Sequence, residues 1–150
     1  MRQEHKLTSK KRIILLSVLG IIPFYFELII YFFYPYLYNN NLLITKGSSS
    51  FYGVLIISFL CGMHWARFIS EGKVKLYILP MLPIIFLCFS YFFNSYFNFN
   101  FLVIIGLLWC LFIDFFFIRS SEFWYLKMRS IITFLAIIPL FTIIFIHSNQ

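Results

Sequence analysis

The chain has 150 residues, of which 62% are apolar, 23% are aromatic and only 11% carry a charge. Soluble domains carry about 25% charged residues, and a water-soluble fold of this size could not hide so much apolar surface. The formal net charge of +7 does not indicate a nucleic-acid partner, because the basic residues form no continuous face and accompany no RNA-binding motif. The composition therefore predicts an all-α, polytopic membrane protein.

A basic tail, residues 1–12, precedes the first apolar segment and is predicted to be cytoplasmic. Its five cations are Arg2, Lys6, Lys10, Lys11 and Arg12. The apolar run that begins at Ile13 is longer than the core of a signal peptide, and no small-x-small cleavage site ends it. We therefore expect a membrane helix here.

Five apolar segments follow in chain order and form one predicted transmembrane domain, residues 13–147. The predicted bundle has spans at residues 13–34, 51–70, 76–93, 99–118 and 130–147. Each is near the roughly 20 residues that cross about 30 Å of hydrocarbon in a helix. Polar connections at 39–50, 71–75, 94–98 and 119–127 separate them. Residues 122–129 are predicted to lie along the inner surface before the last span.

The distribution of Lys and Arg predicts how the spans are oriented. Alternate sides of the membrane carry eleven and one of the twelve, and Lys46 is the single cation on the second side. The positive-inside rule then places the N-terminus inside and the C-terminus outside, which requires an odd number of spans. Tyr34, Tyr96 and Trp124 lie near predicted span ends, where aromatic rings prefer headgroup depth.

The second span carries small and polar residues on two faces. At about 100° per residue, Gly53, His64 and Arg67 share one face, and Ser58 and Gly62 form a small-xxx-small pair on roughly the opposite face. Both faces suit protein neighbours. We therefore expect this span to lie at the centre of the bundle.

The fourth span places Gly106, Cys110 and Asp114 at four-residue intervals, so small residues allow another helix to approach beside the aspartate. The predicted helix-packing residues are thus Gly53, Ser58, Gly62, Gly106 and Cys110.

Four ionisable residues in the predicted spans form the candidate site: Glu27, His64, Arg67 and Asp114. An ionisable side chain costs about 2.5–3.5 kcal/mol at the centre of the bilayer, so these residues should face the bundle interior. Two interpretations stay open. One is a polar clamp between helices; the other is a proton or ligand site in which Asp114 pairs with Arg67 or His64, and His64 changes charge near neutral pH. Glu27 lies too far from the inner end to join directly.

No catalytic, cofactor-binding or metal-ligating set is predicted. The three cysteines lie in apolar segments without a CxxC motif or a histidine at metal-ligand spacing. Haem held by two histidines would need a second histidine at the depth of His64. No Ser or Cys has a histidine and an orienting acid at a spacing typical of a nucleophile.

Several short patterns occur in order along the chain. They are Tyr-Gly-Val at 52–54, Ser-Phe-Leu at 58–60, Gly-Met-His-Trp at 62–65, Trp-Tyr-Leu-Lys-Met-Arg at 124–129, and Thr133. In these patterns, over about residues 13–146, the chain resembles domain of unknown function 3429, a family that includes transmembrane protein 69-like proteins of mitochondria and small proteobacterial membrane proteins. Cys61 and Ala66 stand where the family usually has Gly. The resemblance implies a multi-span inner-membrane protein and supplies no activity, cofactor or partner.

We expect a small non-enzymatic inner-membrane protein, either a membrane subunit or an assembly or interaction protein. Its expected partners are the lipid bilayer and other membrane proteins or a second copy, without nucleic acid. The alternative is a proton-coupled transporter or ion pathway that uses the candidate site. Abundant Ile, Phe, Asn and Lys with only two Ala indicate a bacterial genome of biased composition. The predicted location is therefore the bacterial inner membrane, or the mitochondrial inner membrane in a eukaryote.

Overall fold

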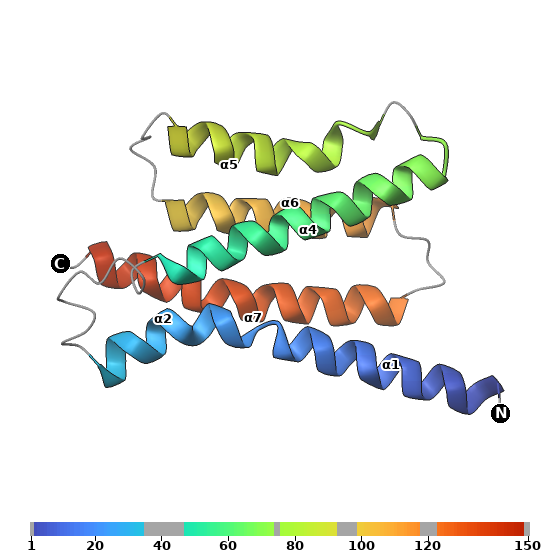
Figure 1. Ribbon diagram of the computed structural model, residues 1–150, viewed down its shortest axis with the longest axis horizontal. Helices are drawn as coiled ribbons and strands as arrows, with labels where there is room; N and C mark the ends of the chain where they lie inside the picture. Colours follow the sequence, from blue (N-terminus) through green and yellow to red (C-terminus); the bar gives the residue numbers. More distant parts are fainter. Residues whose placement is uncertain (1, 35–46, 74–75, 93–98, 118–122, 149–150) are drawn as a thin grey trace.

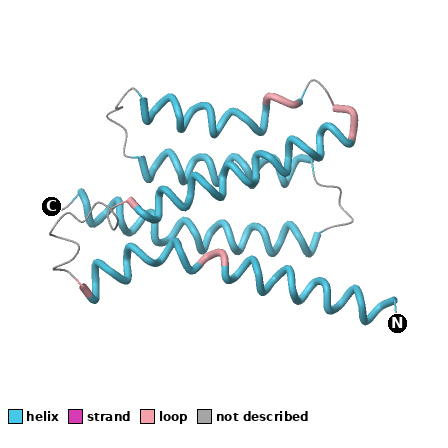
Figure 2. Tube along the Cα trace, in the orientation of Figure 1, coloured by secondary structure: helices cyan, strands magenta, loops and turns pink. Residues whose placement is uncertain are grey.

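The computed structural model describes residues 2–34, 47–73, 76–92, 99–117 and 123–148. Within these ranges every regular element is a helix (Figure 2). The elements are α1 (Arg2–Leu19), α2 (Ile22–Phe33), α4 (Ser48–Ser70), η2 (Leu79–Met81), α5 (Leu82–Phe92), α6 (Phe99–Phe117) and α7 (Phe123–Ser148). The all-α prediction is confirmed. Lys46, Lys75, Arg119 and most of the predicted connections lie outside the described residues.

Four segments are long and apolar enough to cross a membrane, and a fifth apolar helix is shorter. The four are Lys10–Phe33, Ser48–Ser70, Phe99–Phe117 and Phe123–Ile146, and the shorter helix is Leu79–Ser90. The chain is therefore a multi-pass membrane protein. The predicted third span, 76–93, is shorter than expected, because Pro80 and Pro83 occupy its start and the chain there forms a 3-10 turn instead of α-helix.

Two other predicted segments differ in the structure. The first span is broken at Gly20 and Ile21, because Pro23 near the start of α2 has no backbone N–H to continue the helix. Residues 123–129, predicted to lie along the inner surface, are instead the first two turns of α7, which continues through the membrane segment to Ser148. The predicted N-terminal tail is helical from Arg2 onward, as part of α1.

Helices α4 and α6 pair in a constant register. Hydrogen bonds and thiol contacts join residues 49 or 50 positions apart: Ser50 with Asn100, Cys61 with Cys110, and His64 with Asp114. The paired residues advance in the same direction along both helices, so α4 and α6 run parallel (Figure 1).

The parallel pairing determines the role of the short helix between them. The chain must return to the starting end of the bundle before α6 begins, so η2 and α5 together form a crossing of about 22 Å by helical rise. The chain thus traverses the bundle five times. Figure 1 shows the N- and C-terminus at opposite ends, as an odd number of crossings requires. Which compartment each end faces stays a prediction.

The core lies along α6 and the buried face of α4. Ile57, Val103 and Cys110 are completely buried there, whereas large apolar side chains such as Phe134 and Phe141 are exposed on the outer surface. Hydrocarbon tails are as apolar as these side chains, so such an exterior is stable only in lipid.

Pro139 leaves a carbonyl in α7 without its intrahelical donor. Its ring has no N–H to donate to Leu135, four residues earlier. The hydroxyl of Tyr25 in α2 donates to this carbonyl oxygen at 3.0 Å. A residue of another helix thus replaces the missing donor, which is how proline is tolerated in membrane helices.

The same device occurs at Pro83, and a related contact lies at the helix break before Pro23. Pro83 cannot donate to Leu79, whose carbonyl oxygen accepts from Trp109 Nε1 of α6 at 3.1 Å. At the break before Pro23, the Gly20 carbonyl accepts from the Tyr52 hydroxyl of α4 at 3.0 Å. Aromatic side chains with a polar tip therefore join each proline-interrupted helix to a neighbour.

Candidate functional site

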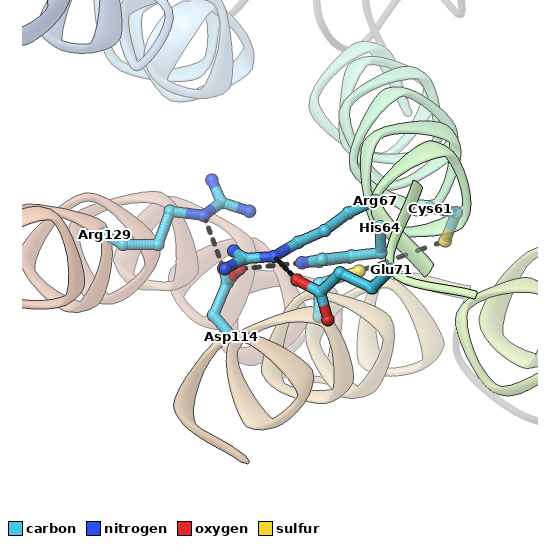
Figure 3. A network of polar contacts seen from close by, with 7 residues as sticks. Cys61, His64, Arg67, Glu71, Asp114 and Arg129 are labelled. Atoms are coloured by element: carbon cyan, nitrogen blue, oxygen red, sulfur yellow. Dashed lines mark hydrogen bonds and ion pairs between the residues drawn. The ribbon is translucent and has the colours of Figure 1, made fainter. Parts of the chain in front are cut away.

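The candidate site is a buried cluster in which three helices meet at the carboxylate of Asp114 in α6. His64 Nε2 of α4 lies 2.7 Å from Asp114 Oδ1, and Arg129 Nε of α7 lies 2.9 Å from Oδ2. Figure 3 shows the imidazole and the guanidinium reaching the carboxylate from opposite sides. The side chain of Asp114 is only 2% exposed. Each carboxylate oxygen thus receives one donor, and the arrangement links α4, α6 and α7.

The carboxylate determines which nitrogen of His64 carries a proton. A carboxylate only accepts hydrogen bonds, so Nε2 is the donor. His64 Nδ1 is buried and has no hydrogen-bond partner among the described residues. With a neutral imidazole the charges of Asp114 and Arg129 cancel, so the cluster is electrically neutral and suited to a low-dielectric interior.

Arg67 is not part of this cluster. Its Nε lies 3.0 Å from Glu71 Oε1, and Lys73 Nζ lies 2.6 Å from Glu71 Oε2. Glu71 is one turn away on the same helix and exposed, so this pairing needs no burial of charge. Lys73 first, and then Arg67, lower the pKa of Glu71 from its ordinary value. Of the two predicted partners for Asp114, the structure therefore shows His64 and not Arg67.

Arg129 is not among the residues that the sequence predicts for the site. It ends the segment 122–129 that is predicted to lie along the inner surface. α7 begins at Phe123, so Arg129 lies six residues, or about 9 Å, inside the helix. A helix start placed earlier would have brought it to the depth of Asp114.

Glu27 holds the start of α4. Its Oε1 accepts from the backbone N–H of Gly47 at 2.9 Å, and its Oε2 accepts from that of Ser49 at 3.1 Å. These are donors that the first turn of a helix leaves free, and the positive end of the helix dipole favours a carboxylate there. Within the described ranges Glu27 has no basic partner and accepts from backbone donors instead, a role that residue types alone do not reveal.

The Glu27 contact and the Asp114 cluster are separate. Ser49 and His64 are fifteen residues apart on α4, or about 22 Å. Gly53, Ile57 and Leu60 fill the buried face between them. The four predicted residues therefore do not line one cavity.

The predicted packing residues divide between the inside and the outside of the bundle. A Cβ added at Gly53 would lie 2.4 Å from Val103 Cγ1, and one at Gly106 would lie 2.7 Å from Ile57 Cδ1. Cys61 Sγ and Cys110 Sγ are 4.0 Å apart in the next layer. These residues lie at the contact between α4 and α6. Ser58 and Gly62 are on the exposed face of α4.

A groove of about 340 Å³ lies beside the cluster, between α1 and α4. Arg129 lines it, but Glu27, His64 and Asp114 do not. No group of three or more His, Cys, Asp or Glu residues that could hold a metal ion occurs among the described residues.

Residues 9–145 match the family described as protein of unknown function (DUF3429). The chain belongs to the DUF3429 family. The matched segment includes every residue of the polar cluster and all the predicted spans except the last two residues of the fifth. No curated protein and no solved structure matches this DUF3429 chain.

Proposed function

We propose that this DUF3429 protein is a non-enzymatic membrane subunit that binds a transmembrane helix of another membrane protein through the exposed face of α4. The observation that supports this most strongly is Gly62. A Cβ built there meets nothing within 4 Å in the described part of the chain, whereas the glycines at 53 and 106 accommodate side chains of a neighbouring helix. Glycine in a membrane helix permits close helix approach.

Gly62 belongs to a continuous exposed face. Phe51, Leu55, Ser58, Gly62 and Ile69 project in nearly one direction at helical spacing, and all of them are exposed. The face is about 27 Å long by helical rise, close to the thickness of the hydrocarbon core. Its large residues flank the small pair Ser58 and Gly62, which suits ridge-and-groove packing of one added helix.

The polar cluster fits this function as a clamp. Asp114 is satisfied by His64 and Arg129, and Glu27 by backbone donors, so these groups hold α2, α4, α6 and α7 together. A rigid α4 presents its outer face without losing conformational entropy on binding, which favours association. We place the protein in the bacterial inner membrane, as its residue composition predicts, with the N-terminus inside, as its charge distribution predicts.

Site-specific photo-crosslinking in native membranes tests the proposal. A benzophenone amino acid replaces Phe51 on the α4 face or, as the matched control, Phe134 on the lipid-facing side of α7, which is similarly exposed. We expect a discrete protein adduct from position 51 that Gly62→Leu abolishes, and no discrete adduct from position 134. Gly62→Leu adds a side chain only into open space, so the fold should be retained.

The size and origin of the adduct decide the outcome. A discrete adduct with a different membrane protein supports the proposal. An adduct of two copies of this chain would replace it with self-association. Equal crosslinking patterns from positions 51 and 134, or an adduct that persists in Gly62→Leu, would contradict the proposed helix-binding face.

A proton-coupled pathway is the second candidate, and one observation favours it: His64 Nδ1 is buried and has no hydrogen-bond partner among the described residues. Proteoliposomes containing a pH-sensitive dye test this directly. Proton movement above that of empty vesicles, reduced by His64→Ala and Asp114→Asn, would support it. Dye traces that match those of empty vesicles would remove it.

A further inference from the structure

The groove beside Arg129 has an apolar floor and two exposed rims. Leu107 of α6 and Ala136 of α7 form part of the buried floor. Leu16 of α1 and Phe59 of α4 line the rims and are 69% and 64% exposed, so the groove faces the lipid. It extends along α7 from Tyr125 to Ala136, about 16 Å.

The two ends of the groove differ in charge. At the end lined by Gly20, the carbonyl of that residue accepts from the Tyr52 hydroxyl of α4, and no charged side chain of the described residues lines the groove there. Tyr125 lines the other end, and beside its neighbour Trp124, just outside the lining, Lys10 Nζ of α1 lies 5.0 Å from the centre of the Trp124 ring. Arg129 lines the groove one turn beyond Tyr125.

The guanidinium of Arg129 retains donors for a ligand. Its Nε donates to Asp114, which is the one hydrogen bond the described residues give it. In Figure 3 the two terminal nitrogens extend beyond that contact. The side chain is 12% exposed, so a charged group reaching it is largely removed from water and its contact is strengthened.

We infer that this groove is a binding site for one anionic phospholipid, with an acyl chain along the apolar floor and the phosphate between Arg129 and Lys10. The inference does not depend on the partner helix proposed for α4. A volume of about 340 Å³ suits a single chain and lies at the small end of ligand sites. The uncharged end beside Gly20 and the cations toward the opposite end match the apolar chain and the charged headgroup of an anionic lipid.

Native mass spectrometry of the full chain, purified in micelles with equal amounts of phosphatidylglycerol and phosphatidylcholine, tests the inference. We expect one phosphatidylglycerol per protein, retained about tenfold over phosphatidylcholine, since an added charge-assisted hydrogen bond has about that effect. Ser17→Phe fills the groove without touching the cluster and should remove the bound lipid. Thr142→Phe, on an exposed part of α7 outside the groove, is its control.

Two charge variants separate the headgroup contact from general attraction. Arg129→Gln should remove the preference for phosphatidylglycerol, whereas Lys127→Gln, the same charge change two residues away and outside the groove, should keep it. If Arg129→Gln fails to fold, lipid retention by Ser17→Phe still tests whether the groove binds the lipid. Unchanged lipid retention in Ser17→Phe, or no preference in the unmodified chain, would overturn the inference. Displacement of the lipid by inorganic phosphate alone would also overturn it, in favour of a soluble anion.

Discussion

Asp114 accepts one hydrogen bond on each of its two oxygens, from side chains on two other helices, and is almost completely buried. The burial of the Arg129 guanidinium is therefore compensated by the negative charge of Asp114. Removing one member of a buried ion pair leaves the other charge uncompensated, and in the low-dielectric interior this is expensive.

We predict that Asp114→Asn lowers the free energy of unfolding by about 3 kcal/mol, because the charge on Arg129 remains buried without its counter-ion. Unfolding in mixed micelles, followed by circular dichroism, measures this. Glu71→Gln is the matched control, since Glu71 is an exposed acid paired with Arg67 and Lys73, and a much smaller loss is expected. Equal stability of both variants would show that the buried cluster is not a clamp.

The pH dependence of the Glu71 contact has a defined sign. Its pKa is lowered in the folded chain, so any stabilisation is present above the ordinary pKa of a glutamate and is lost as the pH falls through the lowered value. Glu71→Gln should remove this dependence and, at neutral pH, lose only the small stabilisation that an exposed ion pair provides.

A partner for Asp114 on the second span was predictable from the sequence, because His64, Arg67 and Asp114 lie at similar depth and need partners in lipid. The choice of His64 over Arg67 was not, since Arg67 can reach the exposed Glu71 instead. The contacts of Glu27 were not predictable either. Its partners are backbone N–H groups at a helix start, and every helix start offers such donors whatever its sequence.

At the scale of the helices, prolines explain where the structure departs from the hydropathy pattern. Apolar composition predicts that a segment lies in the membrane but does not distinguish a regular helix from one that proline breaks or shortens. The hydropathy pattern therefore does not predict the break before Pro23 or the 3-10 turn at Pro80. Nor does it predict the hydrogen bonds that Tyr52 and Trp109 donate to these two places from other helices.

A double-mutant cycle between Tyr25 and Pro139 tests this interhelical compensation. We predict that Tyr25→Phe lowers the free energy of unfolding by about 1 kcal/mol, because the Leu135 carbonyl loses its donor. In a Pro139→Ala background the restored N–H serves that carbonyl, so the same substitution should have little effect. Additive effects in unfolding measurements would mean that the hydroxyl and the proline are independent.

The glycines of α4 should respond oppositely to a methyl group. Gly53→Ala places Cβ 2.4 Å from Val103 Cγ1 and should lower the free energy of unfolding by about 1–3 kcal/mol. Val103→Ala removes that atom and should restore part of the loss. Gly62→Ala meets no described neighbour and should be neutral or slightly stabilising. Similar thermal midpoints for Gly53→Ala and Gly62→Ala would contradict the assigned packing.

For the whole molecule, the parallel register of α4 and α6 determines the path of the chain. Pairs such as Ser50 with Asn100 and His64 with Asp114 require the connecting segment to cross back, even though η2 and α5 are shorter than an ordinary span. The sequence predicted five crossings from its apolar segments, and the alternation of charge independently required an odd number. It could not predict the register, which depends on Gly53 and Gly106 meeting specific side chains of the opposite helix.

Accessibility of single cysteines in intact membrane vesicles tests this path most directly. In a background in which Cys61, Cys88 and Cys110 are replaced by alanine, one cysteine is introduced at Ser9 and, in a second variant, at Ser148. An impermeant maleimide should label Ser9→Cys only from the cytoplasmic side and Ser148→Cys only from the opposite side. Labelling of both positions from the same side would show an even number of crossings and contradict the five-pass bundle.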